Sequence, residues 1–354
     1  MTYEVDEIAM PASLDGPGGK QFLEYAAVSN AVENHALGTD VLSMAPAEML
    51  AEYRDNPHRV RRHLVVREDR RIVARAMITL RPHLPGNGAH LMVDVLPAHR
   101  GRGIGATLLE AAERIAVDAG APVLKVGVAH SAASGGDRIA SPTGFGDVAA
   151  HDDGVRFLTS HGYALEQITR ISLLELGSAP RLEAPAPPDH RVVTWTGPTP
   201  DRWIADLAVL RTRMSTDAPS GALVELEDLW DAARIREHDE RMAGSGRTAL
   251  TAAVEHIPSG SLAGFSELVH SAAGPVAVQE DTLVLREHRG HRLGLLVKLA
   301  AADLLRRHAP DTQAIVTWNA EENRPMLDVN EAMGFRPIGY EGGWQRRALP
   351  GDGE

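Results

Sequence analysis

Cysteine is absent from this chain of 354 residues. Without thiols the protein cannot form disulfides, thiolate metal sites or iron–sulfur clusters, and it has no cysteine nucleophile. Such a composition suits a reducing compartment, and we expect a cytoplasmic protein. Free thiols in any mixture with this protein must therefore come from another molecule.

Long apolar runs are also missing. The N-terminal stretch MTYEVDEIAMPASLDG is acidic and has neither the basic start nor the apolar centre of a signal peptide. No later run approaches the ~18 apolar residues that a membrane-spanning helix needs. The sequence therefore predicts no membrane partner.

Positive charge is scarce, because 36 Lys and Arg residues face 48 Asp and Glu residues, for a net charge of -12. A surface that coats nucleic acid is therefore not expected. The locally basic segment Arg59–Arg71 is interrupted by Glu68 and Asp69, as in a solvated strand and turn. An acidic protein of this kind suits a small cationic substrate better.

The chain is long enough for two domains of about 150 to 175 residues. The clearest boundary is the proline-rich segment GSAPRLEAPAPPDH, which favours an extended spacer. We predict an N-terminal tail (1–19), a first domain (20–176), a linker (177–190), a second domain (191–347) and a C-terminal tail (348–354).

One short motif occurs twice. HRGRGIG begins at His99, and HRGHRLG begins at His288, which is 189 positions later. Each motif follows an apolar strand pattern and precedes an amphipathic helix pattern. The later pairs Gly162-Tyr163 and Gly334-Phe335 are only 172 positions apart, so the first copy contains an insertion of 17 residues, SAASGGDRIASPTGFGD. This self-similarity indicates a duplicated domain.

A strand, a glycine-rich turn and a helix gather backbone N–H groups and a positive helix end, which suits phosphate. Gly101, Gly103 and Gly105 are spaced by two, so the turn is not the G-x-G-x-x-G dinucleotide fingerprint. Neither copy has the Lys-Ser/Thr of a P-loop. Phosphate binding accounts for the second loop, so we expect no metal at Glu287, His288 and His291.

The pattern R-x-x-G-x-G, with Arg100, Gly103 and Gly105 after VDVLP, resembles the acetyl-CoA pyrophosphate loop of the GNAT N-acetyltransferase superfamily. The resemblance covers residues 20–175 and 190–347, and it is to a tandem two-domain member of actinobacterial type. It implies an α/β fold with two GNAT domains, each a splayed, mostly antiparallel sheet flanked by helices. The pantetheine arm of acetyl-CoA would lie in the splay and act as an additional strand of the sheet.

The resemblance also implies which residues contact acetyl-CoA. In the first half they are the strand residues Val93, Asp94 and Val95 and the loop residues Arg100, Gly101, Arg102, Gly103, Ile104 and Gly105. In the second half they are Leu283, Val284, Leu285, Arg289, Gly290, His291, Arg292, Leu293 and Gly294, together with Asn319 and Asn323. Where the first loop has Gly103, the second has Arg292, whose charge we expect to hold a phosphate in place of a lost N–H contact.

The two halves differ at the strand before the loop. The second half has Glu280 and Asp281 where the first has Leu91 and Met92. Many relatives draw a general base from this position, and we favour Asp281, with Glu280 and Glu267 behind it. Strand alternation predicts that only one of the adjacent pair faces the cleft.

Relatives often carry N-x-x-A-x-x-x-Y-x-x-x-G-F, in which the Tyr protonates the departing CoA thiolate. The second half matches at Asn323, Gly334 and Phe335, but Asn330 stands at the Tyr position and cannot supply an acidic proton. We therefore consider Tyr340 or a water as the acid, with a plain sheet residue as the alternative role for Tyr340.

These features predict an acetyl-CoA-dependent N-acetyltransferase that acts on a primary amine of a small cationic molecule by direct attack, with catalysis in the second domain. One alternative is an enzyme similar to mycothiol synthases, from which Arg292 and Asn330 depart. The other is a non-catalytic acyl-CoA sensor or scaffold. The protein is expected to be a monomer or a homodimer.

Overall fold

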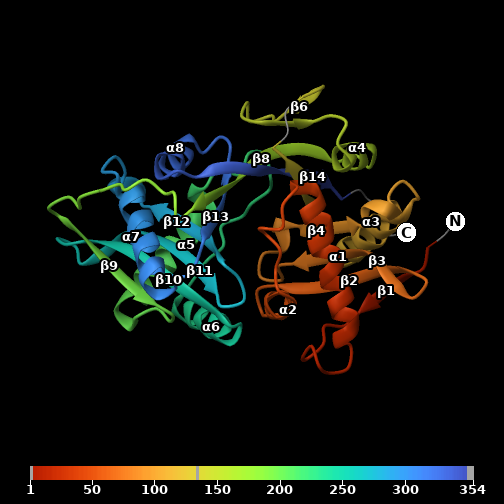
Figure 1. Cartoon of the computed structure of the whole chain (residues 1–354), viewed down its shortest axis with the longest axis horizontal. Coiled ribbons are helices and arrows are strands. Elements are labelled where there is room, and N and C mark those ends of the chain that lie inside the picture. The colour runs from red at the N-terminus through yellow and green to blue at the C-terminus, as the bar shows by residue number, and fades with distance from the viewer. Residues whose placement is uncertain (1–2, 133–134, 349–354) are drawn as a thin grey trace. The chain divides into compact units, whose positions relative to one another are not determined.

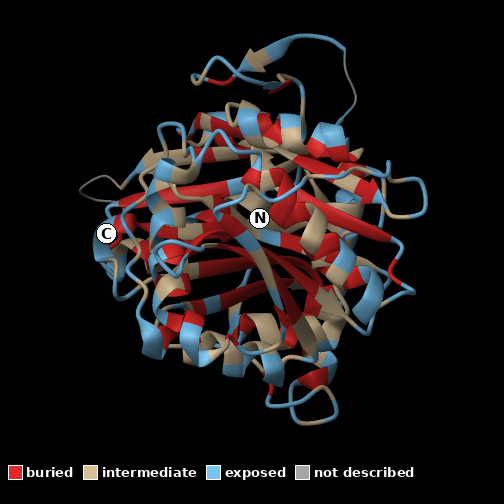
Figure 2. Cartoon of the chain, turned by 90° about the vertical axis from the view of Figure 1, so that its left-hand side faces the viewer, coloured by how far each residue is buried: buried red, intermediate tan, exposed pale blue. Residues whose placement is uncertain are grey.

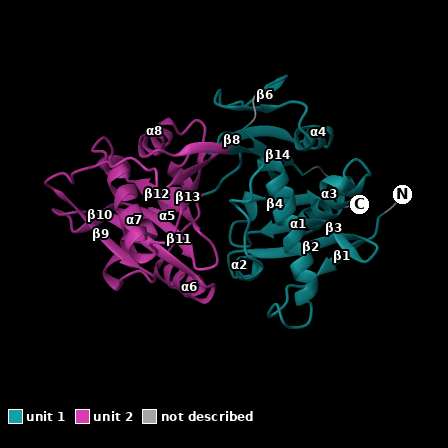
Figure 3. Ribbon diagram, viewed as in Figure 1, with its two compact units in different colours: residues 1–169, 220–226, 339–354 teal, residues 170–219, 227–338 magenta. Residues whose placement is uncertain are grey.

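The structure is a computed structural model that describes residues 3–132 and 135–348 (Figure 1). Its chain forms two compact units (Figure 3). Unit 1 comprises Met1–Thr169, Ser220–Leu226 and Gly339–Glu354, and unit 2 comprises Arg170–Pro219 and Glu227–Ile338. The chain therefore leaves unit 1, returns to it for seven residues, and returns again at its end.

Unit 1 is built on a mixed sheet with strand order β1-β2-β3-β4-β5-β14, followed by the first part of β8. The pair β4 and β5 is parallel, whereas β1 to β4 are antiparallel to their neighbours and β14 is antiparallel to β5. Its elements are β1 (Val5–Ile8), α1 (Gly19–Leu37), α2 (Pro46–Tyr53), β2 (Val60–Glu68), β3 (Arg71–Leu80), β4 (Ala89–Val95), α3 (Ile104–Asp118), β5 (Val123–Ser131), α4 (Asp153–Ser160), β8 (Ala164–Glu175) and β14 (Arg336–Arg347).

Helices cover both faces of the unit 1 sheet because its strands are apolar on both sides. Leu64 and Val66 of β2 pack in one core with α3, whereas Val65 packs in a second core with α1 and α2. Adjacent strand residues point to opposite faces, so α3 lies on one face and α1 and α2 lie on the other. This arrangement holds the turn between β4 and α3 at one edge of a rigid layer.

Unit 2 repeats this plan with strand order β13-β12-β11-β10-β9, beside the second part of β8. Only the pair β12 and β13 is parallel among the pairs from β9 to β13. Its elements are β9 (His190–Thr196), α5 (Ile204–Asp217), α6 (Ala232–Gly244), β10 (Arg247–His256), β11 (Ser261–Ser271), β12 (Val276–Val284), α7 (Leu293–His308), β13 (Ala314–Ala320) and α8 (Arg324–Met333).

The unit 2 sheet is also sandwiched between helices. Val254 and Ala263 pack against α7, whereas their neighbours Ala253 and Leu262 pack against α5 and α6. The burial pattern in Figure 2 follows from this arrangement, with buried residues concentrated on the strands and exposed ones on the outer sides of the helices.

In both units the parallel pair separates part of the way along. The pairing of β4 with β5 ends at Leu91 and Val126, and that of β12 with β13 ends at Gln279 and Thr317. Beyond these points each sheet is splayed just before its glycine-rich turn. The predicted fold, a splayed and mostly antiparallel sheet flanked by helices in each half, is confirmed.

The structure differs from the expected boundaries in three places. Val5–Ile8, expected within a tail, form β1 and pair with β2. Residues 220–226 and the strand from Gly339 onward, both expected in the second domain, belong to unit 1. In addition, the 17-residue insertion contains a strand, because Arg138–Ala140 form β6 and pair with β7 (Asp147–Ala149). Of the expected C-terminal tail, only Ala348 lies within the described residues.

Within residues 3–132 and 135–348, no helix has the length and apolar character needed to cross a membrane.

Candidate active site

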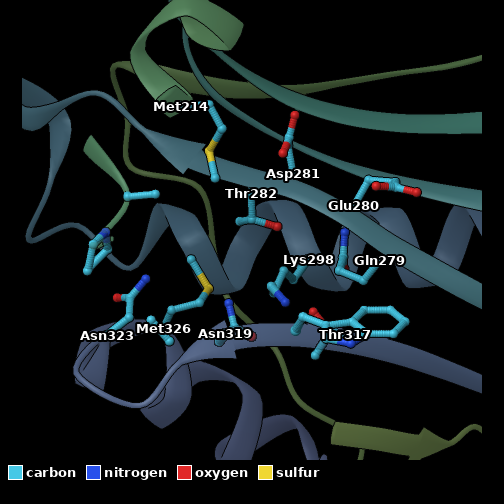
Figure 4. A pocket seen from close by; sticks show the side chains of 14 residues that line it. Met214, Gln279, Glu280, Asp281, Thr282, Lys298, Thr317, Asn319, Asn323 and Met326 are labelled. Atoms are coloured by element: carbon cyan, nitrogen blue, oxygen red, sulfur yellow. The ribbon is translucent and has the colours of Figure 1, made fainter. Parts of the chain in front are cut away.

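A cavity of about 380 Å³ lies in unit 2 where β12 and β13 separate (Figure 4). One wall comes from β12 and the other from β13 and the start of α8, with Met214 from α5 and Lys298 from α7. The lining side chains are those of Met214, Ala218, Pro219, Gln279, Glu280, Asp281, Thr282, Lys298, Thr317, Trp318, Asn319, Ala320, Asn323 and Met326. Four residues expected at the site, Glu280, Asp281, Asn319 and Asn323, are therefore brought together.

Both carboxylates of β12 contribute to the cavity wall, although strand alternation predicts only one. They differ in surroundings. Glu280 is exposed, whereas Asp281 is half-buried and lies 2.8 Å from a guanidinium nitrogen of Arg211. The third carboxylate considered, that of Glu267, is buried and lies 2.7 Å from the same guanidinium.

Arg211 is the centre of this charged cluster. Its guanidinium lies within 6 Å of the rings of Trp230 and Phe265, and its side chain is 6% exposed. Burial disfavours the charged form of Glu267, but the Arg211 guanidinium, together with His238 and the Thr251 hydroxyl, more than offsets burial and lowers the pKa of that carboxyl. Glu267 is therefore an ionised structural partner of Arg211, while Asp281 is the acid that reaches the cavity.

Sequence reasoning missed Arg211, although a signal was present. Arg211 lies on the buried stripe of α5, spaced from Ile204 and Leu207 by seven and four residues. An arginine in the middle of such a stripe is desolvated, so it needs acidic partners from the strands behind it.

The turn after β12 has the geometry expected for a phosphate loop. Arg289 donates to the carbonyl oxygen of Val284 at 3.0 Å and to the carboxylate of Asp217 at 2.8 Å. These contacts tie the loop to β12 and α5, so Arg289 positions the loop. The N–H groups in the first turn of α7 have no partner within the helix, because helix geometry provides none there. Such N–H groups are suited to an anion in front of the turn.

Arg292 precedes α7 and adopts φ 58°, in the left-handed region, where Gly103 of the first loop adopts φ 88°. The loop keeps its path despite the substitution, at the cost of backbone strain. Its side chain is exposed, and among residues 3–132 and 135–348 it has no hydrogen-bond or ion-pair partner. Arg292 is therefore a cation available to a ligand at the loop.

In the corresponding loop of unit 1, two side chains are already engaged with a neighbouring carboxylate. Arg102 pairs with Glu68 at 2.6 Å, and His99 lies 2.8 Å from the same carboxylate. A Cβ atom on Gly105 would lie 3.4 Å from the ring of Phe157, whereas one on Gly294 would meet no described atom within 4 Å. The approach to the helix end is more open in unit 2.

The carboxylates at the splay of unit 1 are arranged differently, with Glu33 of α1 and Glu341 of β14 close to Asp94 of β4. Asp94, expected to contact acetyl-CoA, pairs with the buried guanidinium of Arg75 at 2.6 Å. On β5, Lys125 pairs with Glu225 at 2.7 Å and donates to the carbonyl oxygen of Val224. Segment 220–226 therefore satisfies a buried lysine of unit 1.

Tyr340 is not among the residues that line the unit 2 cavity. It belongs to the part of β14 in unit 1, pairs in register with His130, and packs against the unit 1 core. The structure thus gives it the sheet role that was the alternative to an acid. Val93 and Val95 likewise pack against the unit 1 core, while Leu283, Val284 and Leu285 form the end of β12 and the start of the loop in unit 2.

The splayed sheets, the paired glycine-rich turns and the acidic cavity define an acyltransferase of the GNAT class. Residues 31–134 match the family model described as the acetyltransferase (GNAT) family, so the chain carries a GNAT acetyltransferase domain. No curated protein matches the sequence.

Solved structures extend this likeness to the whole chain. The chain is similar to a tandem GNAT protein from the clavulanic acid biosynthesis pathway, with 25% identity and a TM-score of 0.72, covering 98% of this chain and 99% of that one. It shares its fold with a GCN5-related N-acetyltransferase from Sphaerobacter thermophilus, with 15% identity and a TM-score of 0.66, covering 99% and 96%. The chain thus carries a GNAT acetyltransferase domain and is similar over nearly its whole length to a tandem GNAT protein.

Proposed function

We propose that the protein transfers an acetyl group from acetyl-CoA to a primary amine of a small cationic molecule, and that this reaction takes place in unit 2. The observation that carries the proposal is the cavity at the splay of β12 and β13, whose wall includes two carboxylates of β12, the strand that leads into the open glycine-rich loop. Unit 1 also has a splay and a loop, but Asp94 at its splay is paired with the buried Arg75, and Arg102 of its loop is paired with Glu68.

The unit 2 loop fits the pyrophosphate of acetyl-CoA. The space in front of Gly294 is the cradle that a side chain would fill, and Arg292 is a free cation beside it. The residues proposed to hold acetyl-CoA are Gly290 to Gly294 at the phosphates, the edge of β12 at Leu283 to Leu285 along the arm, and Asn319 and Asn323 on the opposite wall. When bound, acetyl-CoA supplies an activated acyl group.

The amine must lose a proton before it attacks, and Asp281 is the group we propose to receive it. Its ion pair with Arg211 fixes the carboxylate at the cavity wall without burying it fully. Glu280 is the nearest substitute on the same strand, and it also adds negative charge for a cationic substrate. A polyamine or an aminoglycoside-like molecule has the required chemistry.

Unit 1 is proposed to have a structural or regulatory role. Its loop cations are neutralised by Glu68, and Phe157 lies beside Gly105. Both features disfavour a pyrophosphate at that loop. The tandem GNAT protein of the clavulanic acid pathway supports the general plan of two such domains in one chain, but its substrate is not transferred to this protein.

The test is release of free thiol from acetyl-CoA in the presence of a panel of amines, followed with a thiol reagent. Because the protein has no cysteine, all reagent colour reports on CoA. We expect amine-dependent release that is lost in Asp281→Asn and retained in Arg100→Ala. If acetyl-CoA binds but no amine raises thiol release above background, the enzyme proposal fails and an acyl-CoA sensor becomes the better account.

A further inference from the structure

A buried lysine and a buried asparagine form a polar pair inside unit 2. Nζ of Lys298 lies 2.7 Å from Oδ1 of Asn330, and Nδ2 of Asn330 lies 2.6 Å from Oδ1 of Asn319. Lys298 and Asn330 are each 1% exposed. Lys298 and Asn319 line the cavity, and Figure 4 shows both between β12 and the start of α8.

The fold itself does not require this pair. The 189-residue spacing aligns Lys298 with Leu109, and the 172-residue spacing aligns Asn330 with Leu158. Both leucines are almost fully buried in the unit 1 core. A buried ammonium group is costly relative to an apolar side chain. Unit 2 therefore buries a lysine and an asparagine, at a cost in free energy, at the two positions where unit 1 packs leucines.

The surroundings of Lys298 bring its pKa close to neutral pH. Burial lowers the pKa of its ammonium group to about 7. Within residues 3–132 and 135–348, Asn330 is its one hydrogen-bond partner, so two of the three N–H bonds of an ammonium group remain for other acceptors.

Few other ionisable groups face this part of the cavity. On β12 they are Glu280 and Asp281, and behind them Arg211 of α5 and Glu267 of β11 are paired. β13 and α8 present the non-ionisable side chains of Thr317, Asn319, Asn323 and Met326. The charged residues of α8 are engaged in ion pairs, because Arg324 pairs with Asp328 and Glu331, and Glu331 also pairs with Arg170.

We propose that Lys298 is the general acid of the acyl transfer, held in place by Asn330. This inference rests on the proposed function. The amine nitrogen forms a bond to the thioester carbonyl carbon, the carbon–sulfur bond breaks, and its electron pair stays on sulfur. Lys298 gives a proton to that sulfur and becomes a neutral amine, while the proton of the attacking amine passes to Asp281 or to water.

The choice of Lys298 follows from the other groups in the cavity. Asn330 has no acidic proton, Tyr340 belongs to unit 1, and the carboxylates of β12 lie on the side proposed to accept protons. Among the residues that line the cavity, Lys298 is the one cation. It can therefore stabilise negative charge on sulfur as well as protonate it.

The test compares Lys298→Met with Leu109→Met, a matched control at the aligned position of unit 1. Methionine keeps the length of the lysine stem and removes the charge. We expect Lys298→Met to lower kcat about 100-fold, with the Kd of acetyl-CoA within about threefold of the original, and to abolish the loss of kcat as pH rises above about 7. Leu109→Met should leave kcat and its pH profile unchanged.

A second readout needs no turnover. The ultraviolet absorbance of the CoA thiolate gives the pKa of the CoA thiol when CoA is bound. We expect bound CoA to have a lower thiol pKa than free CoA, and Lys298→Met to remove that difference. An unchanged thiol pKa, or an unchanged alkaline limb of the kcat profile, would overturn the role of Lys298. Failure of every amine to react would instead overturn the proposed function, while the thiol titration still reports on Lys298.

Discussion

The guanidinium of Arg211 lies 2.8 Å from the carboxylate of Asp281 and joins α5 to β12 at the cavity wall. The ion pair holds the carboxylate of Asp281 at the splay of β12 and β13 and leaves it partly solvated. The side chain of Asp281 is 33% exposed, whereas that of Arg211 is only 6% exposed. A charge that is fixed but reachable is suited to accepting a proton from a bound amine.

Asp281→Asn should lower kcat by about 10²- to 10⁴-fold, because the amide cannot accept the proton of the attacking amine. Its oxygen can still accept a hydrogen bond from Arg211, so the midpoint of urea unfolding should change little. The measurement is the steady-state rate of thiol release. Glu280→Gln is the control, and a larger loss of kcat in that variant would assign the base to Glu280 instead.

Arg211→Met should destabilise unit 2 by about 3–5 kcal/mol at neutral pH, because Glu267 is left buried without its cation. Urea unfolding followed by tryptophan fluorescence reports mainly on unit 2, which holds Trp195, Trp203, Trp230 and Trp318, while unit 1 holds Trp344. A loss below about 1 kcal/mol would mean that the cluster is not a structural centre.

The unmodified protein and Arg211→Met should also differ in how their stability depends on pH. With Arg211 present the pKa of Glu267 is lowered, so its contribution to stability is present above the unfolded pKa of about 4.3 and is lost as pH falls through the folded pKa. Without Arg211, burial becomes the dominant influence on Glu267 and raises that pKa, so the loss of stability in Arg211→Met should be smaller at acid pH than at neutral pH. Parallel pH profiles for the two proteins would contradict this account.

Arg292→Gly should have opposite effects on stability and on binding. Glycine adopts positive φ without strain, so unit 2 should gain about 1 kcal/mol in its free energy of unfolding. The free cation at the loop is lost, so acetyl-CoA should bind several-fold more weakly. Arg292→Lys keeps the charge and should bind more tightly than Arg292→Gly. Tighter binding by the glycine variant would show that Arg292 hinders the phosphates.

Local patterns in the sequence predicted most of the elements of both halves. The amphipathic helix pattern after HRGRGIG is α3 (Ile104–Asp118), and the apolar run before each glycine turn is a strand. Such predictions depend on periodicity and on glycine, which act over a few residues. Lys298 could have been found in the same way, since it lies four residues before Ala302 and seven before Leu305 on the buried stripe of α7.

Pairings over long distances could not be predicted. Residues 339–347 are separated by more than 200 residues from their partner strand β5. The alternation of their polar and apolar side chains does not indicate which strand they pair with. The assignment of Tyr340 to the second half followed from chain order alone. The pairing of Arg211 with Asp281 likewise depends on a packed arrangement of helix and sheet that no short motif encodes.

The central claim is that unit 2, not unit 1, binds acetyl-CoA. Gly294→Asp places a carboxylate in the open space at the start of α7, and Gly105→Asp makes the matched change in unit 1. An acidic residue in the first helical turn favours the helix, so loss of binding in Gly294→Asp cannot be ascribed to helix unfolding.

The deciding measurement is isothermal titration of the three proteins with acetyl-CoA. We predict one acetyl-CoA per chain for the unmodified protein and for Gly105→Asp, and no binding for Gly294→Asp. Binding that survives in Gly294→Asp and is lost in Gly105→Asp would contradict the assignment.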